Sequence, residues 1–236
     1  MYLKRKADAY LNAWKSDPNR SPLIIKGPRQ VGKTETIDYF AAHNYRSVVE
    51  INFVEEPKYR AITADGYGAN TIVRNISLID PAKKFIPGDT LIFFDEIQAH
   101  PDIATALKFF KIDGKYDVIC SGSMLGISYK QIESNSVGYK TDYEMRSLDF
   151  EEFLWARGYD EAVIESMFTH LCDATPFSEV EMNVFSTAFM DYCVLGGMPA
   201  VVASHIRTGT FEGTLQLQRQ LIFCLLYTSP SPRDRG

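Results

Sequence analysis

The chain has 236 residues, of which 45% are hydrophobic and 23% charged, and its formal net charge is -5. This length and composition suit one α/β domain with a smaller appendage, and they exclude wholesale disorder. The weakly acidic balance gives the protein no bulk electrostatic reason to coat nucleic acid.

Helical and strand patterns alternate along the first 148 residues. Apolar residues at helical spacing predict a helix from Tyr2 to about Trp14. Short apolar runs predict strands, and amphipathic segments between them predict helices. The expected strands are Leu23–Lys26, Arg46–Phe53, Thr90–Phe94, Tyr116–Cys120 and Tyr143–Leu148, and the expected helices are Thr34–His43, Pro57–Ala64, a segment before Pro87-Gly88, and Ile103–Lys111. This alternation indicates βαβ units and a mostly parallel sheet covered on both faces.

The pattern becomes wholly helical near Ser147–Asp149. We place a domain boundary there, with a P-loop core over residues 1–148 and a helical lid region over 149–223. The expected helices of this region are Glu151–Arg157, Asp160–Leu171, Ser178–Leu195, Ala200–His205 and Thr214–Leu226. Phe150, Phe153 and Leu154 share one helical face, which we expect to pack against the sheet. Gly196-Gly197 before Pro199 predicts a break or hinge between helices.

The cysteines and the chain's start limit the class of protein. Four cysteines occur without a C-x-x-C pair, which favours buried free thiols over zinc or redox chemistry. The N-terminus has no apolar signal region, and no stretch approaches the length of a membrane span. We therefore expect a protein of the reducing cytoplasm with no membrane partner.

One glycine-rich segment matches the pattern G-x-x-x-x-G-K-[ST] between a predicted strand and a predicted helix. Glycines let consecutive backbone N–H groups face inward around phosphates, and the following helix adds its positive N-terminal end. Lys33 is expected to reach the β- and γ-phosphates, and the Thr34 hydroxyl to bind Mg²⁺. The predicted phosphate-binding residues are Gly27, Pro28, Arg29, Gln30, Val31, Gly32, Lys33, Thr34 and Glu35.

An acidic pair follows the third predicted strand. The apolar run Thr90–Phe94 buries the strand and aims Asp95 at the metal of the phosphate site, where it is expected to bind Mg²⁺. Glu96 is expected to polarise the attacking water as a general base, which favours hydrolysis over phosphate transfer to another substrate. A base-recognition motif of the form N-K-x-D is absent from the chain, which favours ATP over GTP.

The fourth predicted strand ends in small polar residues, Ser121-Gly122-Ser123. We expect a side chain there to lie between the phosphate loop and the acidic pair, where it holds the attacking water or senses the γ-phosphate. Ser123 is the first choice and Ser121 the second, and an ordinary turn is the alternative.

Several motifs together resemble the AAA domain 14 family of bacterial and archaeal ATPases. The matching segments are Ile24–Thr34, Glu50–Phe53, Asp95–Gln98, Ser121–Ser123, Leu148–Phe153 and Gly196–Pro199. The resemblance extends to about Phe223 and implies an AAA-like P-loop ATPase core followed by a helical lid. Members of this family usually carry a C-terminal domain of unknown function, DUF4143.

One position departs from the family pattern. Relatives often have Gly-Arg shortly after the Gly-Ser turn, a candidate arginine finger, where this chain has Gly138-Tyr139-Lys140. An arginine finger can raise turnover by several orders of magnitude. Arg29, Lys140 and Arg146 are the candidates to replace it, and slow or partner-dependent hydrolysis is the expected consequence.

Three functions therefore compete. The first is a Mg²⁺-dependent ATPase that couples turnover to movement of its C-terminal domain, and the second is an ATP-gated interaction module with little turnover. The third, a nucleic-acid-associated ATPase, has no support from the net charge. A protein partner or a homo-oligomer is expected to involve the C-terminal region.

The end of the chain has an unusual sequence. Residues 224–234 resemble the translation of a sequencing-library adapter, so residues 224–236 are expected to be non-native. On this interpretation the natural protein continues past Phe223, and most of the DUF4143-type domain is missing.

Overall fold

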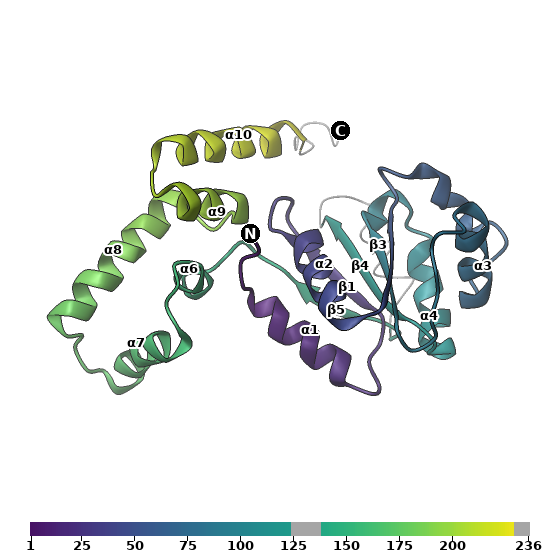
Figure 1. Ribbon diagram of the computed structural model, residues 1–236, viewed down its shortest axis with the longest axis horizontal. Helices are drawn as coiled ribbons and strands as arrows, with labels where there is room; N and C mark the ends of the chain where they lie inside the picture. The colour runs from purple at the N-terminus through teal and green to yellow at the C-terminus, as the bar shows by residue number, and fades with distance from the viewer. Residues whose placement is uncertain (124–137, 229–236) are drawn as a thin grey trace. The chain divides into compact units, whose positions relative to one another are not determined.

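The computed structural model describes residues 1–123 and 138–228 of the chain (Figure 1). The last part of the expected non-native tail, residues 229–236, therefore lies outside the described residues. The chain forms two compact units. We call them the sheet unit, with residues 7–28 and 33–145, and the helical unit, with residues 1–6, 29–32 and 146–236.

Among the described residues of the sheet unit, five parallel strands form one sheet in the order β2-β3-β4-β1-β5. Their bounds are β1 Leu23–Gly27, β2 Ser47–Asn52, β3 Thr90–Asp95, β4 Asp117–Ser123 and β5 Thr141–Glu144. The predicted parallel sheet is thus confirmed. β4 pairs with both β1 and β3, so it separates the strand before the phosphate loop from the strand before the acidic pair.

Helices cover both faces of this sheet. Their bounds are α1 Lys6–Ser16, α2 Lys33–Asn44, the 3-10 helices η1 Pro57–Thr63 and η2 Ile97–Ala99, α3 Ala69–Ile79 and α4 Ile103–Asp113. Figure 1 shows α1 and α2 on one side of the sheet and α3 and α4 on the other. Alternate strand residues such as Ile24, Ile92 and Phe94 are fully buried in one core with side chains of α3 and α4.

In the described part of the helical unit, residues 146–228 form five further helices. Their bounds are α6 Phe150–Ala156, α7 Glu161–Asp173, α8 Glu179–Leu195, α9 Pro199–Thr208 and α10 Glu212–Thr228. Asp149 caps α6 and Ser178 caps α8, each within a capping box that also uses a glutamate three residues on. Helix α8 ends at Leu195, and Pro199 begins α9, which confirms the predicted break at Gly196-Gly197.

The buried side chains of α6 pack within the helical unit. Phe153 packs with Leu148, Leu195 and Val201, whereas Leu154 packs with side chains of α7 and α8. Both contact sets belong to the helical unit, because α6 is short and the neighbouring helices enclose it on two sides. The helical period correctly identified the buried face but carried no information about its partner.

Three predictions need correction. Helix α1 begins at Lys6 rather than Tyr2, where the Lys6 N–H donates to Glu152 Oε1 at 2.7 Å. Strand β5 covers residues 141–144 rather than 143–148, because Leu23 pairs with Thr141 and β1 turns away after Gly27. The helix expected before Pro87-Gly88 is α3, which ends at Ile79.

The cysteines also differ from expectation. Cys120 is buried in β4, but the other three free cysteines are exposed, because their helices bury only one stripe of residues: Cys172, Cys193 and Cys224. Among the helices of the described residues, none is both long enough and apolar enough to cross a membrane.

Candidate functional site

The sheet order brings three polar segments to one edge. The phosphate loop follows β1, the acidic pair ends β3, and two serines end β4, which lies between those strands. Carboxyl ends of parallel strands meet at one edge of a sheet, where α/β proteins place their ligands. Ser121 and Ser123 belong to the strand itself, so the alternative of an ordinary turn is wrong.

The phosphate loop has the backbone that anion binding needs. Gln30 and Gly32 both have positive φ, 66° and 85°, so left-handed residues alternate with right-handed or extended ones and consecutive N–H groups can converge. Lys33 begins α2, and its Nζ donates to the carbonyls of Gly27 at 3.0 Å and Pro28 at 2.8 Å. The ammonium group therefore lies across the opening residues of the loop, where phosphate oxygens would be received.

Gly27 permits the close approach of two strands at the start of this loop. A Cβ atom at Gly27 would lie 2.1 Å from the carbonyl oxygen of Met145. The N–H of Met145 donates to the Lys26 carbonyl at 2.7 Å, which extends the β1–β5 pairing up to the loop. Glycine is thus required for steric reasons at the first position of the motif.

Asp95 joins the phosphate loop to β3. The Thr34 hydroxyl donates to Asp95 Oδ2 at 3.3 Å, so the two predicted metal ligands lie side by side. Asn52 Nδ2 also donates to Oδ2 at 3.3 Å, and the Ser121 hydroxyl donates to Oδ1. Asp95 is only 4% exposed, and these donors hold its carboxylate in one orientation.

Glu96 follows directly in a left-handed conformation, with φ 53° and ψ 46°. Its side chain accepts a hydrogen bond from Gln98 Nε2, while Gln98 Oε1 accepts one from the Ser123 N–H at 3.3 Å. Gln98 therefore ties the predicted general base to the end of β4. Gly122 makes room for this amide, because a Cβ there would lie 2.8 Å from Gln98 Oε1.

Negative charge gathers around Asp95. Burial, followed by the charges of Asp95 and Glu35, raises the pKa of Asp38. Burial, followed by the charges of Asp38 and Asp95, raises the pKa of Glu50. A cation near Asp95 would relieve this repulsion.

The donors at Asp95 suit magnesium. Within residues 1–123 and 138–228, no group of three or more His, Cys, Asp or Glu side chains gathers as a metal cage. Mg²⁺ prefers oxygen ligands and keeps several waters, with one or two protein ligands and substrate phosphates completing its shell. The oxygens of Thr34 and Asp95 fit that pattern.

Sequence reasoning assigned no role to Asn52 and Gln98, which contact Asp95 and Glu96. Both lie in segments that carry the family resemblance, Glu50–Phe53 and Asp95–Gln98. That resemblance was the available signal, but which atom each amide contacts depends on strand pairing. Asn52 faces Asp95 in the β2–β3 register.

Lys140 lies just before β5, at the amino ends of the strands and opposite the carboxyl ends where the phosphate loop begins. Thr141 pairs with Leu23 at the start of β1, whereas the phosphate loop follows Gly27. At about 3.3 Å per residue, the backbone of Lys140 is roughly 16 Å from that loop. Its ammonium group pairs with Asp142 at 2.6 Å. Lys140 therefore does not replace an arginine finger within this chain.

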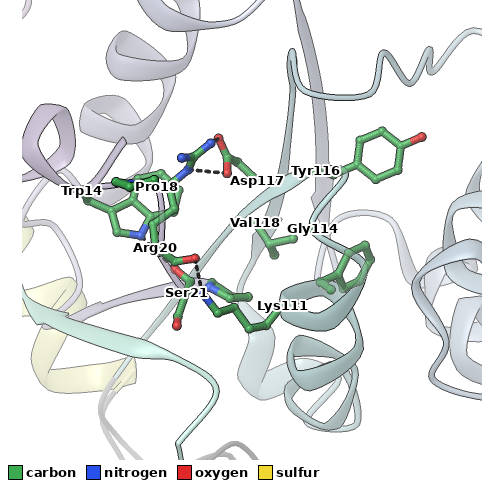
Figure 2. A pocket seen from close by; sticks show the side chains of 11 residues that line it. Trp14, Pro18, Arg20, Ser21, Lys111, Gly114, Tyr116, Asp117 and Val118 are labelled. Carbon is green, nitrogen blue, oxygen red and sulfur yellow. Dashed lines mark hydrogen bonds and ion pairs between the residues drawn. The ribbon is translucent and has the colours of Figure 1, made fainter. Parts of the chain in front are cut away.

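A cavity of about 130 Å³ lies at the amino ends of the strands, between the loop before β1 and the start of β4 (Figure 2). Arg20 Nε and Nη2 donate to the two Asp117 oxygens at 2.6 and 3.0 Å, and the Tyr45 hydroxyl donates to Asp117 at 2.8 Å. Lys111 Nζ donates to the Arg20 carbonyl at 2.9 Å. Because these charges satisfy one another, we interpret the cavity as structural.

Comparison with solved structures gives likenesses at low identity. Domain III of the Thermotoga maritima replication initiation protein DnaA is 14% identical with a TM-score of 0.48, and the match covers 99% of this chain and 91% of that one. The S. cerevisiae Hsp104–ADP complex is 16% identical with a TM-score of 0.44, over 67% of this chain and 24% of that one. C. elegans PCH-2 is 11% identical with a TM-score of 0.38, over 75% and 50%. The chain thus spans half or less of the latter two proteins.

Comparison of sequences gives a firmer result. No curated protein matches the chain significantly. Residues 19–154, more than half of the chain, match the family model described as AAA domain, which is the AAA domain 14 family suggested by the motifs. The matched range includes the phosphate loop, the acidic pair and the serines of β4. This chain belongs to the AAA domain 14 family and has a nucleotide-binding, ATPase-like domain.

Proposed function

We propose that this protein binds MgATP and hydrolyses it, and that nucleotide state moves its C-terminal region. The observation that carries the proposal is the 3.3 Å contact between Thr34 Oγ1 and Asp95 Oδ2. These atoms come from segments 61 residues apart, and each belongs to a motif that independently predicts magnesium binding. Their meeting at the carboxyl edge of the sheet supports a single phosphate and metal site.

The loop residues bind the triphosphate in this proposal. Backbone N–H groups of residues 27–35 and the N-terminal end of α2 receive the phosphate oxygens. Lys33 exchanges its carbonyl partners for the β- and γ-phosphates, which is favourable because a charged acceptor forms the stronger hydrogen bond. Thr34 and Asp95 hold Mg²⁺, which supplies charge neutralisation at the phosphates when bound.

Glu96 takes a proton from the attacking water. Gln98 orients the Glu96 carboxylate by donating a hydrogen bond to it. Gln98 also accepts a hydrogen bond from the Ser123 N–H, so the orientation of Glu96 depends on the position of β4. Ser121 orients Asp95, and Ser123 at the end of β4 contacts the attacking water or the γ-phosphate in this proposal. These roles are positioning and general-base roles, which typically contribute factors of 10²–10⁴ each.

The moving part is the helical region, which we propose to be the start of a DUF4143-type domain. Gly196 ends α8 with φ 68° and ψ -173°, and Pro199 begins α9 three residues later. This break allows α9 and α10 to rotate as one element, since only a few residues need to change conformation. Sequencing the gene across residues 224–236 tests the adapter interpretation of that segment.

The experiment compares Lys33→Ala and Glu96→Gln with wild type by calorimetry and phosphate release. We expect Lys33→Ala to abolish MgATP binding, because the Lys33 ammonium at the start of α2 is the charge expected to reach the β- and γ-phosphates. Glu96→Gln should bind MgATP at near wild-type affinity and lose turnover by at least about 100-fold. Glu165→Gln, at an exposed position on α7, is the matched control.

Tight MgATP binding by Lys33→Ala would contradict the phosphate assignment. Equal turnover by wild type and Glu96→Gln would remove Glu96 from the mechanism.

An ATP-gated interaction module is the second candidate. Two observations favour it: Lys140 lies at the amino ends of the strands, and apolar side chains of the helical region are exposed. In this function the protein binds MgATP and hydrolyses it slowly when no partner is present. It recruits a partner or a second copy through the helical region. Turnover that rises with protein concentration would indicate that another copy supplies the missing arginine. A salt-dependent shift with duplex DNA would instead support the nucleic-acid function.

A further inference from the structure

Arg5 is a buried arginine just before α1, and it contacts the phosphate loop. It is 5% exposed. Its Nη1 donates to the Val31 carbonyl at 2.8 Å, its Nη2 to the Arg146 carbonyl at 2.6 Å, and its Nε to Glu152 Oε1 at 3.1 Å. The planar guanidinium thus bridges three chain segments, which a lysine ammonium cannot do with the same geometry.

The carbonyl that Arg5 contacts lies at the centre of the loop. Val31 is 2% exposed and lies between Gln30 and Gly32, the two loop residues with positive φ. Because the amides of such a loop face inward to the phosphates, its carbonyls need partners on the outside. Arg5 supplies that partner with a charged donor, which holds the loop in the open, amide-inward conformation.

Glu152 holds Arg5 in turn. Its side chain is 6% exposed, and its carboxylate oxygens also accept from the N–H groups of Lys6 at 2.7 Å and Asp149 at 3.1 Å. The second of these bonds is part of the capping box of α6. The position of Arg5 is therefore linked to the start of α6 through fixed hydrogen bonds.

The same part of the loop also packs against α9. A Cβ at Gly32 would lie 3.5 Å from Pro199 Cγ and 3.7 Å from Arg5 Nη1. Residues 29–32 belong to the helical unit together with Arg5, Glu152 and Pro199. The centre of the phosphate loop, residues 29–32, thus belongs to the same unit as the helices that nucleotide binding is proposed to move.

We propose that Arg5 is a positioning residue of the phosphate loop, and that Glu152 makes nucleotide affinity depend on the position of α6. This inference rests on the proposed function, since it assigns the control of the same nucleotide site. Its reverse follows by linkage: bound nucleotide fixes the loop, the loop fixes Arg5, and Arg5 stabilises the start of α6.

The test measures MgATP affinity by calorimetry and thermal stability by scanning calorimetry. Arg5→Met alone removes the positive charge that faces the buried Glu152 carboxylate and can fail to fold, so Arg5→Met/Glu152→Gln is the key variant. Removing both charges should restore stability towards wild type. Affinity should stay about tenfold or more below wild type, since the Val31 carbonyl has lost a charged donor. Lys4→Gln, next to Arg5 and exposed, should match wild type.

Two further measurements separate positioning from stability. Arg5→Lys should show an intermediate affinity at near wild-type stability, and MgATP should raise the melting temperature of the double variant less than that of wild type. Recovery of both stability and affinity in the double variant would overturn the proposal. If wild type binds and every Arg5 variant binds equally, only this inference falls. If wild type itself binds no MgATP, the proposed function falls and this inference falls with it.

Discussion

The two units bury their apolar residues to very different extents. In the sheet unit all six residues of β3 are buried, and Phe93 and Phe94 have no exposed surface. In α8 of the helical unit, only three of 17 residues are buried: Phe185, Ala188 and Leu195. A strand that is covered by helices on both faces buries all of its residues, whereas a helix that packs along one stripe leaves the rest of its surface exposed.

The exposed residues of the helical unit include large apolar side chains. Val180 is 72% exposed, Met190 63%, Met182 50% and Phe189 49%. Two of them, Met182 and Phe189, line a hollow of about 510 Å³ beside α7 and α8. Exposed apolar surface of this kind is typical of interaction sites. The sheet unit is thus expected to be the stable part, and the helical unit the part that depends on something further.

Alanine substitution at two glycines tests whether the two units differ in rigidity, because an added Cβ would lie equally close to a backbone carbonyl oxygen at each position. A Cβ at Gly27 would lie 2.1 Å from the Met145 carbonyl oxygen, and one at Gly197 would lie 2.1 Å from that of Leu148. Gly27→Ala should cost about 4 kcal/mol or more and abolish nucleotide binding, because paired strands cannot move apart. Gly197→Ala should cost less, because the loop between α8 and α9 can shift. Urea unfolding measures both, and equal costs would show that the units are equally rigid.

Two phenylalanines provide the same contrast for packing. Phe94 is fully buried, with ring centroids of Phe53 at 5.7 Å and Phe110 at 6.3 Å, so Phe94→Ala should cost about 3–5 kcal/mol. Phe189 is half exposed and touches Phe150, so Phe189→Ala should cost below about 1 kcal/mol. Thermal denaturation followed by calorimetry compares them. A large loss from Phe189→Ala would mean that the exposed face of α8 is covered in solution.

The cap of α8 tests whether the units unfold separately. Ser178 accepts a hydrogen bond from the Glu181 N–H and, in return, donates its own N–H to the Glu181 carboxylate at 2.9 Å. Ser178→Ala should cost about 1 kcal/mol. If the units are independent, only the less stable of two calorimetric transitions should shift. A shift of both transitions would show that the units unfold together.

The smallest expected effect concerns the charges around Asp95. The pKa of Asp38 is raised in the folded protein, mainly by burial and then by Asp95 and Glu35. Its contribution to stability is thus full below its ordinary pKa and is lost as pH rises through the folded value. Asp38→Asn should therefore raise stability slightly at pH 7, and this gain should vanish in acid. Urea midpoints at several pH values check this, and a gain that does not depend on pH would contradict it.

Local sequence was sufficient wherever one motif carries its own geometry. The phosphate loop, the acidic pair and the alternating strands were predictable, because the residue types and spacing that bind phosphate are contiguous in the chain. The capping boxes that begin α6 and α8 are equally local, and the helices they begin were predicted within one or two residues. These features depend on neighbours within a few residues, so they can be identified from the sequence alone.

Features that join distant segments were decided by the tertiary structure. The sequence alone did not indicate that Asn52 would hold Asp95 or that Arg5 would contact the Val31 carbonyl, 26 residues away. It also did not identify the partners of α6 within the helical unit, and it gave the wrong bounds for β5. Strand order, register and helix packing are set by which surfaces exclude water best when the whole chain is compact, and no local pattern contains that comparison.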